Sequence, residues 1–467
     1  MNGSNTSNEL VLEIEPPIRL GPGHSSAGGL ISHHADSKAE QDPVPGPKIV
    51  IQGWYGNGNL GDEIILECML AELRNNLPGA TFVVISDDPE DTKRRHGVDS
   101  ILRGGGRMQR FRRLQTLAGA DLFILGGGEL IKHYGSTELS ILTWLGPLEL
   151  AHEMGVPTMT YAVGVSDTLS PRAEAATKAI LSKTDAVLVR DQLSLDVLKR
   201  LGVSRARLTA DPAFLLPELH PTHRVHGGAG ELKVSVFVNP WYVTRNVIPD
   251  SEAWGHFKTS MARAVDGLIE GYKARVRFIP MQVTKADDDR AVAREIVALA
   301  RNRDLIEVRE SGVSPEELLS LMAESDLVIG MRLHSLILSA ALGVPAVAIE
   351  YQSKVKRFCT SIGASDWTVA IDDPSADSIQ HLCMEAALGA YPLAQVRQRL
   401  PALQDLAREN ALVAAALISR PGNRGNRLSR TARGSIEVAR RALGRKEWIQ
   451  APQSVAEVSA VGRVEQT

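Results

Sequence analysis

The sequence predicts an α/β protein that contains two parallel sheets, each covered by helices on both faces. Short apolar runs rich in Val, Ile and Leu alternate with amphipathic stretches along most of the chain, which is typical of parallel strands that are buried on both sides. The alternation stops at residues 217–230, where Pro, Gly and polar residues cluster, and then starts again. Such a cluster is typical of a linker, so we expect two domains of one architecture that face a central cleft.

The first series of elements starts at Lys48, where the composition changes from polar to apolar. Each apolar run is short and is followed by a helical pattern, as expected for central strands. Helices are expected at Glu63–Asn75 and Pro171–Lys183, among others. The strands expected in this half are Lys48–Ile51, Phe82–Ile85, Leu122–Leu125, Met159–Val163 and Ala186–Val189.

The second series repeats this pattern, so both halves are expected to be Rossmann-like. Its expected strands are Lys233–Val238, Val276–Ile279, Leu327–Ile329 and Ala346–Ile349, and its expected helices lie near 251–271, 286–301, 314–324 and 375–389. The expected parts of the chain are an N-terminal segment at 1–47, domains at 48–218 and 231–391, a closing helix at 392–419 and a tail at 420–467.

The composition limits the classes of function. Of the 467 residues 43% are hydrophobic, and 52 basic against 55 acidic residues give a net charge of −3, which argues against a general attraction to nucleic acid. The cysteines Cys68, Cys359 and Cys383 have no metal-ligand spacing, so each is expected to be a small buried side chain in a reducing, cytoplasmic setting. No secretory signal and no membrane-spanning stretch is recognised, so a soluble protein is expected.

Several segments outside the strands are polar or charged. Residues 1–47 are rich in Ser, Gly, Pro and Asn and are expected to be disordered. Residues 420–446 contain nine basic residues and one acid, Glu437; a flexible solvated tail is favoured, and peripheral contact with the inner face of a membrane is the alternative. Residues 101–120 contain five arginines and no acid; a solvated helix face is favoured over a surface for an anionic acceptor.

The turn Gly330–Ser335 is the strongest candidate for a functional site. It joins an apolar strand to an apolar helix, so it is expected at the carboxyl end of a strand, where open α/β sheets bind ligands. Free backbone N–H groups and the helix dipole favour an anion there. Arg332 can bind a carboxylate or a phosphate with its planar guanidinium, and His334 can donate a proton near neutral pH. A small acidic substrate is the expected ligand.

Two glycine-rich turns follow strands of the first half. The turn Gly53–Glu63 can form an anion-binding concavity, because Gly and Asn tolerate left-handed backbone angles, and Asp62 is expected to cap the next helix. In the turn Gly126–Glu129, Glu129 can act as a base, bind a hydroxyl group or complement the helix dipole. Arg190, at the end of another strand, is expected to point into the cleft or to form a surface ion pair. The candidates for substrate binding in the two turns are Gly56, Asn57, Gly58, Asn59, Gly61, Asp62, Gly127, Gly128 and Glu129.

Taken together, these motifs resemble the polysaccharide pyruvyl transferase family over residues 48–390. The resemblance implies a fold like that of the two-Rossmann glycosyltransferases, the glycosyltransferase-B architecture. It also implies transfer of a pyruvyl group from phosphoenolpyruvate to a sugar, which gives a cyclic ketal. The matching pieces are Gly53–Glu63, Gly126–Gly128, Val189–Ser194, Ala210–Ala213, Gly330–Ser335 and Tyr351–Phe358.

The resemblance further implies roles for single residues. In the family, arginines hold phosphoenolpyruvate and the histidine of the Arg-Leu-His motif is the proposed general acid, which assigns these roles to Arg332 and His334. Arg190 matches the arginine that the other domain contributes. Lys354 is expected to bind substrate. The family often has Asp-Pro after the tyrosine of this late motif, whereas this chain has Gln352–Ser353, which leaves the acceptor class open.

The expected function is that of a transferase that moves a pyruvyl group from phosphoenolpyruvate to a sugar of a polysaccharide or of a lipid-linked precursor. No metal and no further cofactor are expected, because the sequence shows no Asp/His cluster with metal-ligand spacing. The alternatives are a glycosyltransferase that uses a nucleotide sugar and a non-catalytic glycan-binding protein. A dinucleotide oxidoreductase is least favoured, because the first turn is too long for the dinucleotide fingerprint. The sequence is compatible with an oligomer.

Overall fold

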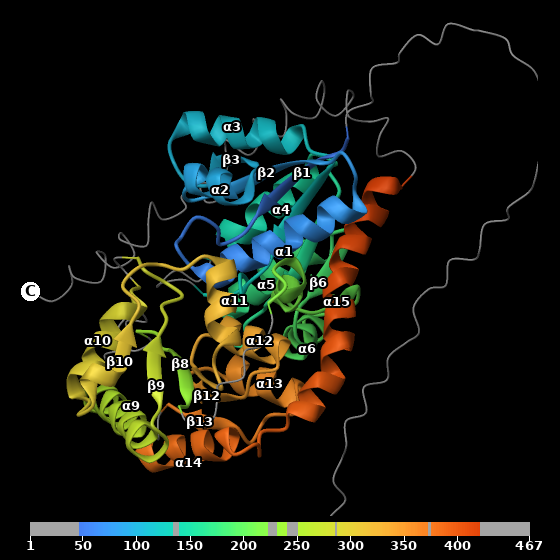
Figure 1. Ribbon diagram of the computed structural model, residues 1–467. Coiled ribbons are helices and arrows are strands. Elements are labelled where there is room, and N and C mark those ends of the chain that lie inside the picture. The colour runs from blue at the N-terminus through green and yellow to red at the C-terminus, as the bar shows by residue number, and fades with distance from the viewer. Residues whose placement is uncertain are drawn as a thin grey trace, which may run out of the picture. The chain divides into compact units, whose positions relative to one another are not determined.

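The computed structural model describes residues 46–133, 140–222, 231–240, 251–284, 287–371 and 375–420. Within these residues the chain forms two parallel sheets, and helices alternate with the strands (Figure 1). The expected α/β class with two Rossmann-like sheets is therefore confirmed. The expected domain boundaries stay predictions, and the segments 1–45 and 421–467, which include most of the expected N-terminal segment and almost all of the basic tail, lie outside the described residues.

Seven parallel strands form the first sheet. They are β1 (Lys48–Gln52), β2 (Thr81–Ser86), β3 (Asp99–Leu102), β4 (Leu122–Gly126), β5 (Thr158–Val163), β6 (Ala186–Val189) and β7 (Ala206–Leu208). Their order in the sheet is β3-β2-β1-β4-β5-β6-β7. The strand order therefore reverses its direction between β1 and β4, which pair in parallel from Ile49 opposite Leu122 to Gln52 opposite Leu125.

Six parallel strands form the second sheet. They are β8 (Lys233–Phe237), β9 (Arg275–Phe278), β10 (Ile306–Val308), β11 (Leu327–Gly330), β12 (Ala346–Glu350) and β13 (Thr368–Ala370). Their order is β10-β9-β8-β11-β12-β13. The two sheets thus share one topology, and the reversal in the second sheet lies between β8 and β11.

Helices connect successive strands. Those of the first half are α1 (Leu60–Asn76), α2 (Pro89–His96), α3 (Arg107–Ala118), α4 (Leu142–Glu153), α5 (Pro171–Leu181), α6 (Gln192–Arg200), the 3-10 helix η1 (Pro212–Leu215) and α7 (Leu216–Leu219). Those that follow are α9 (Ser251–Tyr272), α10 (Asp289–Leu299), the 3-10 helix η2 (Arg303–Leu305), α11 (Pro315–Ala323), α12 (Leu333–Leu342), α13 (Ser353–Ser361), α14 (Ala376–Ala387) and α15 (Leu393–Ser419). Several begin at a Ser or Asp cap that accepts a backbone N–H of the first turn, such as Ser170 before α5 and Asp191 before α6.

Every strand that was expected from an apolar run is present, and the four unexpected strands, β3, β7, β10 and β13, are the edges of the two sheets. They are short, and polar residues such as Asp99, Arg207 and Glu307 interrupt their apolar pattern, because an edge strand faces solvent along one side. Residues 216–219 form the short helix α7, so the start of the expected linker at 217–230 is helical.

The start of α1 differs from the expectation. The helix begins at Leu60, and its cap is Asn59, whose side chain accepts the Gly61 N–H at 3.0 Å. The prediction that Asp62 caps this helix is therefore wrong. Asp62 lies in the first turn of the helix and its side chain is buried.

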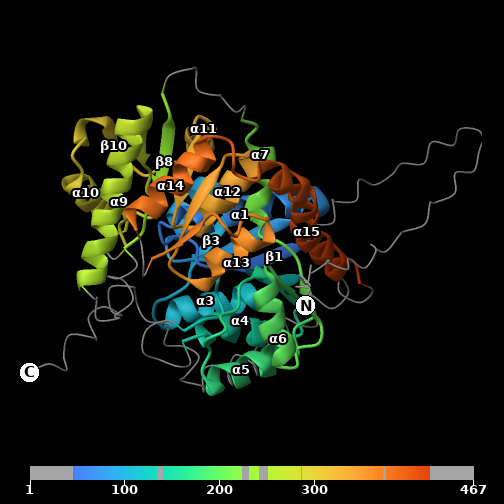
Figure 2. The ribbon, with the colours of Figure 1, turned by 90° about the horizontal axis from the view of Figure 1, so that it is seen from below.

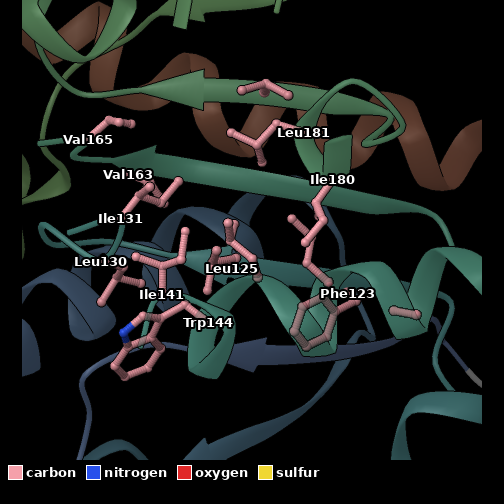
Figure 3. Packing of buried hydrophobic residues seen from close by; sticks show 14 of the residues in the cluster. Phe123, Leu125, Leu130, Ile131, Ile141, Trp144, Val163, Val165, Ile180 and Leu181 are labelled. Carbon is pink, nitrogen blue, oxygen red and sulfur yellow. The ribbon is translucent and has the colours of Figure 1, made fainter. Parts of the chain in front are cut away.

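Helices cover both faces of the first sheet. On one face, α3, α4, α5 and α6 contribute to an apolar cluster around Phe123 and Leu125 of β4; these helices lie together at the bottom of Figure 2. Figure 3 shows part of this cluster, in which Trp144 of α4 and Ile180 of α5 pack with the β4 side chains. On the other face, α1 and α15 pack against β1. The first sheet is therefore buried on both sides, as its continuous apolar strands require.

The two halves share buried apolar surface. One cluster contains Ile64 and Phe214 of the first half together with Phe237 and Ile337 of the second. The helix α15 also joins them, because Val396 near its start lies in a cluster of the second half and Leu417 near its end lies in a cluster of the first. Residues before 217 and after 230 thus contribute to one connected core.

Two further expectations concern the whole chain. The three cysteines are buried and unpaired, which confirms that they serve as small core side chains. Among the residues that the structure describes, no helix is both long and apolar enough to cross a bilayer.

Candidate active site

The candidate residues lie at the carboxyl ends of central strands. The turn 53–59 follows β1, the turn 127–129 follows β4, and Arg332 and His334 follow β11. These strands flank the points where the strand order reverses in each sheet, which is the usual ligand position in open α/β folds. The structure therefore places the turns selected from the sequence at equivalent positions of the two halves.

The turn after β1 is held in place from both halves. Gly56 and Gly58 have φ angles of 73° and 67°, which favour glycine. The Gly56 N–H donates to Glu63 at 2.8 Å, and the Asn57 amide donates to Asp87. The backbone N–H of Leu60 donates to the carbonyl of Met281 in the second half at 2.8 Å. The turn is thus rigid, and Asn57 is engaged by the protein itself.

His334 faces the first half across this contact. It lies in the first turn of α12, and its ring packs against Gly61 so closely that a Cβ on Gly61 would lie 2.0 Å from His334 Nδ1. His334 Nε2 lies 3.7 Å from the Asp211 carboxylate, beyond hydrogen-bond distance. This nitrogen is buried and has no hydrogen-bond partner among the described residues, although 14% of the side chain is exposed. A buried nitrogen in this state is available to a ligand.

Arg190 approaches the same carboxylate from the end of β6. Its Nη1 donates to Asp211 at 3.0 Å, and both side chains are almost fully buried. Its Nε is buried and forms no hydrogen bond with the residues that the structure describes; the Asp191 carboxylate lies 3.5 Å away. Burial alone would raise the pKa of Asp211, but His334, Arg190 and the Ala213 N–H together lower it to about 2. Asp211 is therefore a fixed anion between the histidine and the arginine.

Glu129 joins the two halves through lysines. Its carboxylate lies 3.1 Å from Lys132 Nζ and 3.2 Å from Lys354 Nζ, which comes from α13 in the second half. Burial opposes ionisation of Glu129, but Lys354, Lys132 and Arg190 outweigh it and hold the pKa of Glu129 well below its usual range. Glu129 is therefore an ionised ligand for lysines and is unsuited to act as a base near neutral pH.

Asp62 is a buried carboxyl group of this cluster whose pKa is raised. Burial raises the pKa of Asp62 to about 6, against the opposing effect of His334. Among the described residues the Asp62 carboxylate has no salt bridge, and a Cβ on Gly128 would lie 2.7 Å from its Oδ1. Gly127 and Gly128 have φ angles of 65° and 75°. The glycines after β4 thus allow the backbone to pass close to Asp62 and α1.

Arg332 lies beside this cluster and faces other acids. Its guanidinium donates to both oxygens of Asp289, to Asp287 at 2.9 Å and to Gln282 at 3.4 Å. Asp289 also accepts the backbone N–H groups of Met281 and Gln282, each at 3.0 Å. Arg332 is thus already neutralised by two carboxylates. Its contacts with Gln282, Asp287 and Asp289 fix the residues beside Met281, whose carbonyl holds the turn after β1.

The structure therefore brings together His334, Arg190, Glu129, Lys354 and Asp62 from motifs that are far apart in the sequence. Gly61 and Gly128 line this cluster, while Asn57 and Arg332 face its surroundings. Sequence reasoning gave no role to the acids and the lysine that complete it. Asp211 lies in the family motif Ala210–Ala213, and residues 287–289 lie in the helix expected near 286–301; only the fold shows which charged side chains they contact. The missed residues are Lys132, Asp211, Asp287 and Asp289.

A cavity of the second half lies away from this cluster. A cavity of about 320 Å³ is lined by Lys233, Arg275 and Glu307, among others, at the opposite end of the second sheet from Arg332. At the candidate site, side chains of the two halves are in direct contact instead. Within the described part of the chain, no group of His, Cys, Asp and Glu side chains is arranged to hold a metal ion.

The contact between Gly61 and His334 can be tested by substitution. Gly61→Ala is expected to lower activity by about 10- to 100-fold, because the new Cβ must displace the ring and a catalytic group misplaced by about 1 Å has effects of this size. Gly255→Ala is the matched control, because Gly255 is also helical and a Cβ there meets open space. Steady-state rates and thermal unfolding of both variants check this. Equal activity of the two variants would contradict the assigned contact.

Comparison with known proteins relates this chain to one protein family. A model of the polysaccharide pyruvyl transferase family matches residues 59–353. The amylovoran biosynthesis protein AmsJ of Erwinia amylovora is 24% identical over 225 residues, which are 45% of this chain and 54% of that protein. The chain thus spans about half of the length of this curated relative.

Solved structures with a similar fold have very different sequences. A UDP-N-acetylglucosamine 2-epimerase of Neisseria meningitidis, bound to UDP-N-acetylglucosamine, has a TM-score of 0.52 at 9% identity and covers 80% of this chain and 100% of that chain. A protein of Listeria monocytogenes assigned as the same type of epimerase has a TM-score of 0.56 at 12% identity, covering 79% and 95%. These likenesses establish the fold alone, which is of the glycosyltransferase-B type.

The matched residues include the parts of the site that come from both halves. Residues 59–353 contain Glu129, Arg190, Asp211 and His334, and Lys354 follows directly. The family model spans more than half of the chain. The chain therefore belongs to the polysaccharide pyruvyl transferase family.

Proposed function

We propose that this protein transfers the pyruvyl group of phosphoenolpyruvate to a sugar of a polysaccharide or its precursor and forms a cyclic ketal. The observation that carries the proposal is a pair of buried nitrogens, His334 Nε2 and Arg190 Nε, on two sides of Asp211. Neither nitrogen has a hydrogen-bond partner in the part of the chain that the structure describes. Together they offer a proton and a hydrogen-bond donor to a small anion. Family membership supports the same reaction.

His334 supplies the first proton in the proposed mechanism. As a sugar hydroxyl attacks the central carbon of phosphoenolpyruvate, protonated His334 delivers a proton to the methylene carbon, which becomes the ketal methyl group. Asp211 is ionised and 3.7 Å from the ring, so it stabilises the imidazolium and orients it toward the substrate. The electron pair of the double bond forms the new C–H bond while the oxygen forms the new C–O bond.

Asp62 accepts the proton of the attacking hydroxyl. Its carboxylate is the member of the cluster with a pKa of about 6, and general bases work best when their pKa is near the operating pH. A second hydroxyl of the sugar then displaces phosphate and closes the ring. The overall balance is simple: of the two hydroxyl protons, one ends on the methyl carbon and the other leaves with phosphate.

The anionic groups of phosphoenolpyruvate require cations. Arg190, Lys132 and Lys354 surround Glu129 and Asp211, so the substrate must share these cations with the two acids. Lys354 comes from the second half and Glu129 from the first, so substrate binding would rearrange a contact between the halves. Arg332 serves as a positioning residue in this proposal, because its guanidinium is bound by Asp289 and Asp287.

A product assay tests the proposal. The purified protein is incubated with phosphoenolpyruvate and a panel of hexose-bearing glycans and lipid-linked sugars, and phosphate release is compared with the mass gain of the acceptor. Equal amounts of phosphate and ketal are expected. Titration calorimetry with UDP- and GDP-sugars addresses the nucleotide-sugar alternative. Binding and cleavage of a nucleotide sugar, with no phosphate from phosphoenolpyruvate, would overturn the proposal.

The pKa of Asp62 predicts a pH dependence. The rate is expected to fall as the pH drops below about 6, where Asp62 becomes protonated, and Asp62→Asn should lose this acidic limb together with most of the activity. The effect on stability has the opposite sign. Because the folded protein raises this pKa above its ordinary 3.8, wild-type stability falls as the pH rises from about 4 to 6. Asp62→Asn should therefore be roughly 2–3 kcal/mol more stable than the wild type above pH 6 and similar to it near pH 4.

Two measurements check this pair of effects. Rates as a function of pH give the acidic limb, and urea denaturation at pH 4.5 and pH 8 gives the stability difference between Asp62→Asn and the wild type. An unchanged acidic limb in Asp62→Asn would remove Asp62 from the mechanism. A stability difference independent of pH would contradict the raised pKa.

A further inference from the structure

The exposed face of α3 combines arginines with large apolar side chains. Arg107, Met108, Phe111, Arg112 and Gln115 are exposed, and their spacing of three and four residues places them on one face of the helix. Met108 is 76% exposed and Phe111 is 52% exposed. The opposite face, with Leu114 and Leu117, is buried in the core of the first half. The exposed apolar side chains are therefore a feature of a firmly anchored helix and not of a frayed one.

The charge of this face has one sign. The stretch 101–120 contains no acid, and neither Arg107 nor Arg112 forms a salt bridge with any residue that the structure describes. Arg113 binds the carbonyls of Leu102 and Gly104, at 3.2 Å and 2.6 Å, and so fixes the loop before the helix. Figure 1 shows α3 beyond the β3 edge of the first sheet, and Figure 2 shows it from below on the side of α4.

We propose that the exposed face of α3 docks on the surface of an anionic lipid bilayer. Arginines beside an anionic leaflet are attracted to its headgroups, and Met and Phe side chains gain by entering the boundary between headgroups and acyl chains. A soluble polyanion would use the arginines and would gain nothing from Met108 and Phe111. The combination on one face therefore favours a lipid surface as the partner.

The start of α3 is linked to the candidate site. Arg103, four residues before the helix, lies over the rings of Trp54 and Trp144, at 4.9 Å and 4.5 Å from their centroids. It also binds Asp87, which holds Asn57 in the turn after β1. Because β1 and β3 are parallel strands of one sheet, their carboxyl ends lie at the same end of the sheet. The turns that follow these strands therefore lie at the end where the candidate site is found. A bilayer under α3 would thus be near the candidate site.

This arrangement indicates that the acceptor sugar is carried on a lipid. That inference about the acceptor rests on the proposed function. A sugar carried on a lipid anchor would reach a site held beside the bilayer, whereas a free oligosaccharide would not need the docking surface. The docking itself is independent of catalysis, so it can be measured in the absence of phosphoenolpyruvate. Failure of docking and failure of pyruvyl transfer are therefore separate results.

Vesicle sedimentation tests the docking with the full chain. Vesicles of phosphatidylcholine with phosphatidylglycerol are compared with pure phosphatidylcholine, at low and high salt. The wild type is expected to bind the anionic vesicles, and Arg107→Gln/Arg112→Gln should bind about 10- to 30-fold less, because each arginine near an anionic leaflet changes partitioning about five-fold. Met108→Ser/Phe111→Ser should also lose binding. Leu388→Ser is the matched control, since Leu388 is as exposed as Met108 but lies far along the chain after α14.

A labelled variant gives a direct readout at the helix. The three native cysteines are buried, so Phe111→Cys can be labelled selectively with an environment-sensitive dye. Its emission is expected to shift to the blue on anionic vesicles, while the same dye on Leu388→Cys should not respond. Circular dichroism checks that each variant is folded. Because the substituted side chains are exposed, the substitutions are expected to leave the fold intact.

Three results would overturn the proposal. Unchanged vesicle binding of both α3 double variants would place the contact elsewhere, for example in residues 420–446. Loss of binding in the arginine variant alone, with equal binding to a soluble anionic polysaccharide, would identify a polyanion surface. A concentration-dependent dimer that the Met108→Ser/Phe111→Ser variant abolishes would place a second copy of the chain on this face.

Discussion

Replacement of His334 by alanine is expected to lower kcat for pyruvyl transfer by about 10²- to 10⁴-fold, the range typical of positioned general-acid catalysis. The ring is held between Gly61 and the Asp211 carboxylate, and its Nε2 makes no hydrogen bond within the described residues. The substitution therefore removes the proton source and breaks no hydrogen bond of that nitrogen. Initial rates of phosphate release at saturating phosphoenolpyruvate measure the effect.

A control separates this chemical role from a structural one. His381→Ala removes an exposed histidine of α14 in the same half and should leave both the rate and the stability near those of the wild type. The KM for phosphoenolpyruvate should change much less than kcat in His334→Ala, because Arg190 and the lysines remain. Near wild-type turnover of His334→Ala would exclude His334 as the acid.

Replacement of Arg332 by alanine is expected to cost about 3–5 kcal/mol of folding free energy. Asp289 is almost completely buried and its carboxylate is bound by the Arg332 guanidinium. Removing one partner of a buried ion pair leaves the other charge uncompensated, which has a cost of this size. Urea denaturation near pH 8 measures the loss. A reduced rate is expected as well, because Arg332 fixes the segment that holds the turn after β1.

Two further variants and a change of pH test this explanation. Arg332→Ala/Asp289→Asn should recover most of the stability, because an asparagine oxygen can still accept the Met281 and Gln282 N–H groups without a charge. Arg290→Ala removes a partly exposed pair with Asp288 and should cost at most about 1 kcal/mol. Burial already raises the pKa of Asp289 to about 6, so the loss in Arg332→Ala should be larger at pH 8 than at pH 5, where the carboxyl group is protonated. A loss that does not depend on Asp289 or on pH would contradict the pairing.

The sequence was sufficient for the central part of each sheet and insufficient for the edges. Runs such as Leu122–Leu125 and Ala346–Ile349 are apolar on both faces because helices cover them on both sides, and that burial is visible in the composition. An edge strand such as Ile306–Val308 has a neighbour on one side only and carries Glu307 toward solvent. Three residues with one polar member do not differ from a loop by pattern alone, so their pairing depends on tertiary contacts.

The same limit applies to the candidate site. Position at the end of a strand was enough to select His334, Arg190 and Glu129, because the carboxyl ends of parallel strands meet at one edge. The charged partner of each side chain could not be predicted from the sequence, because partners such as Glu129 and Lys354 are more than two hundred positions apart. Arg332 illustrates the consequence: its residue type suggests an anion site, while the structure shows its guanidinium bound by Asp287 and Asp289.

The position of α15 has a consequence for synthesis of the chain. Ala411, Ala414 and Leu417 complete the apolar core around Ile49 of the first strand, yet they are translated more than three hundred and fifty residues later. During synthesis, the N-terminal half is therefore expected to expose the apolar face that α15 later covers, and chaperones can bind to that face. A fragment that stops at residue 218 should accordingly be recovered from inclusion bodies, and supplying residues 392–420 as a separate peptide should improve its yield.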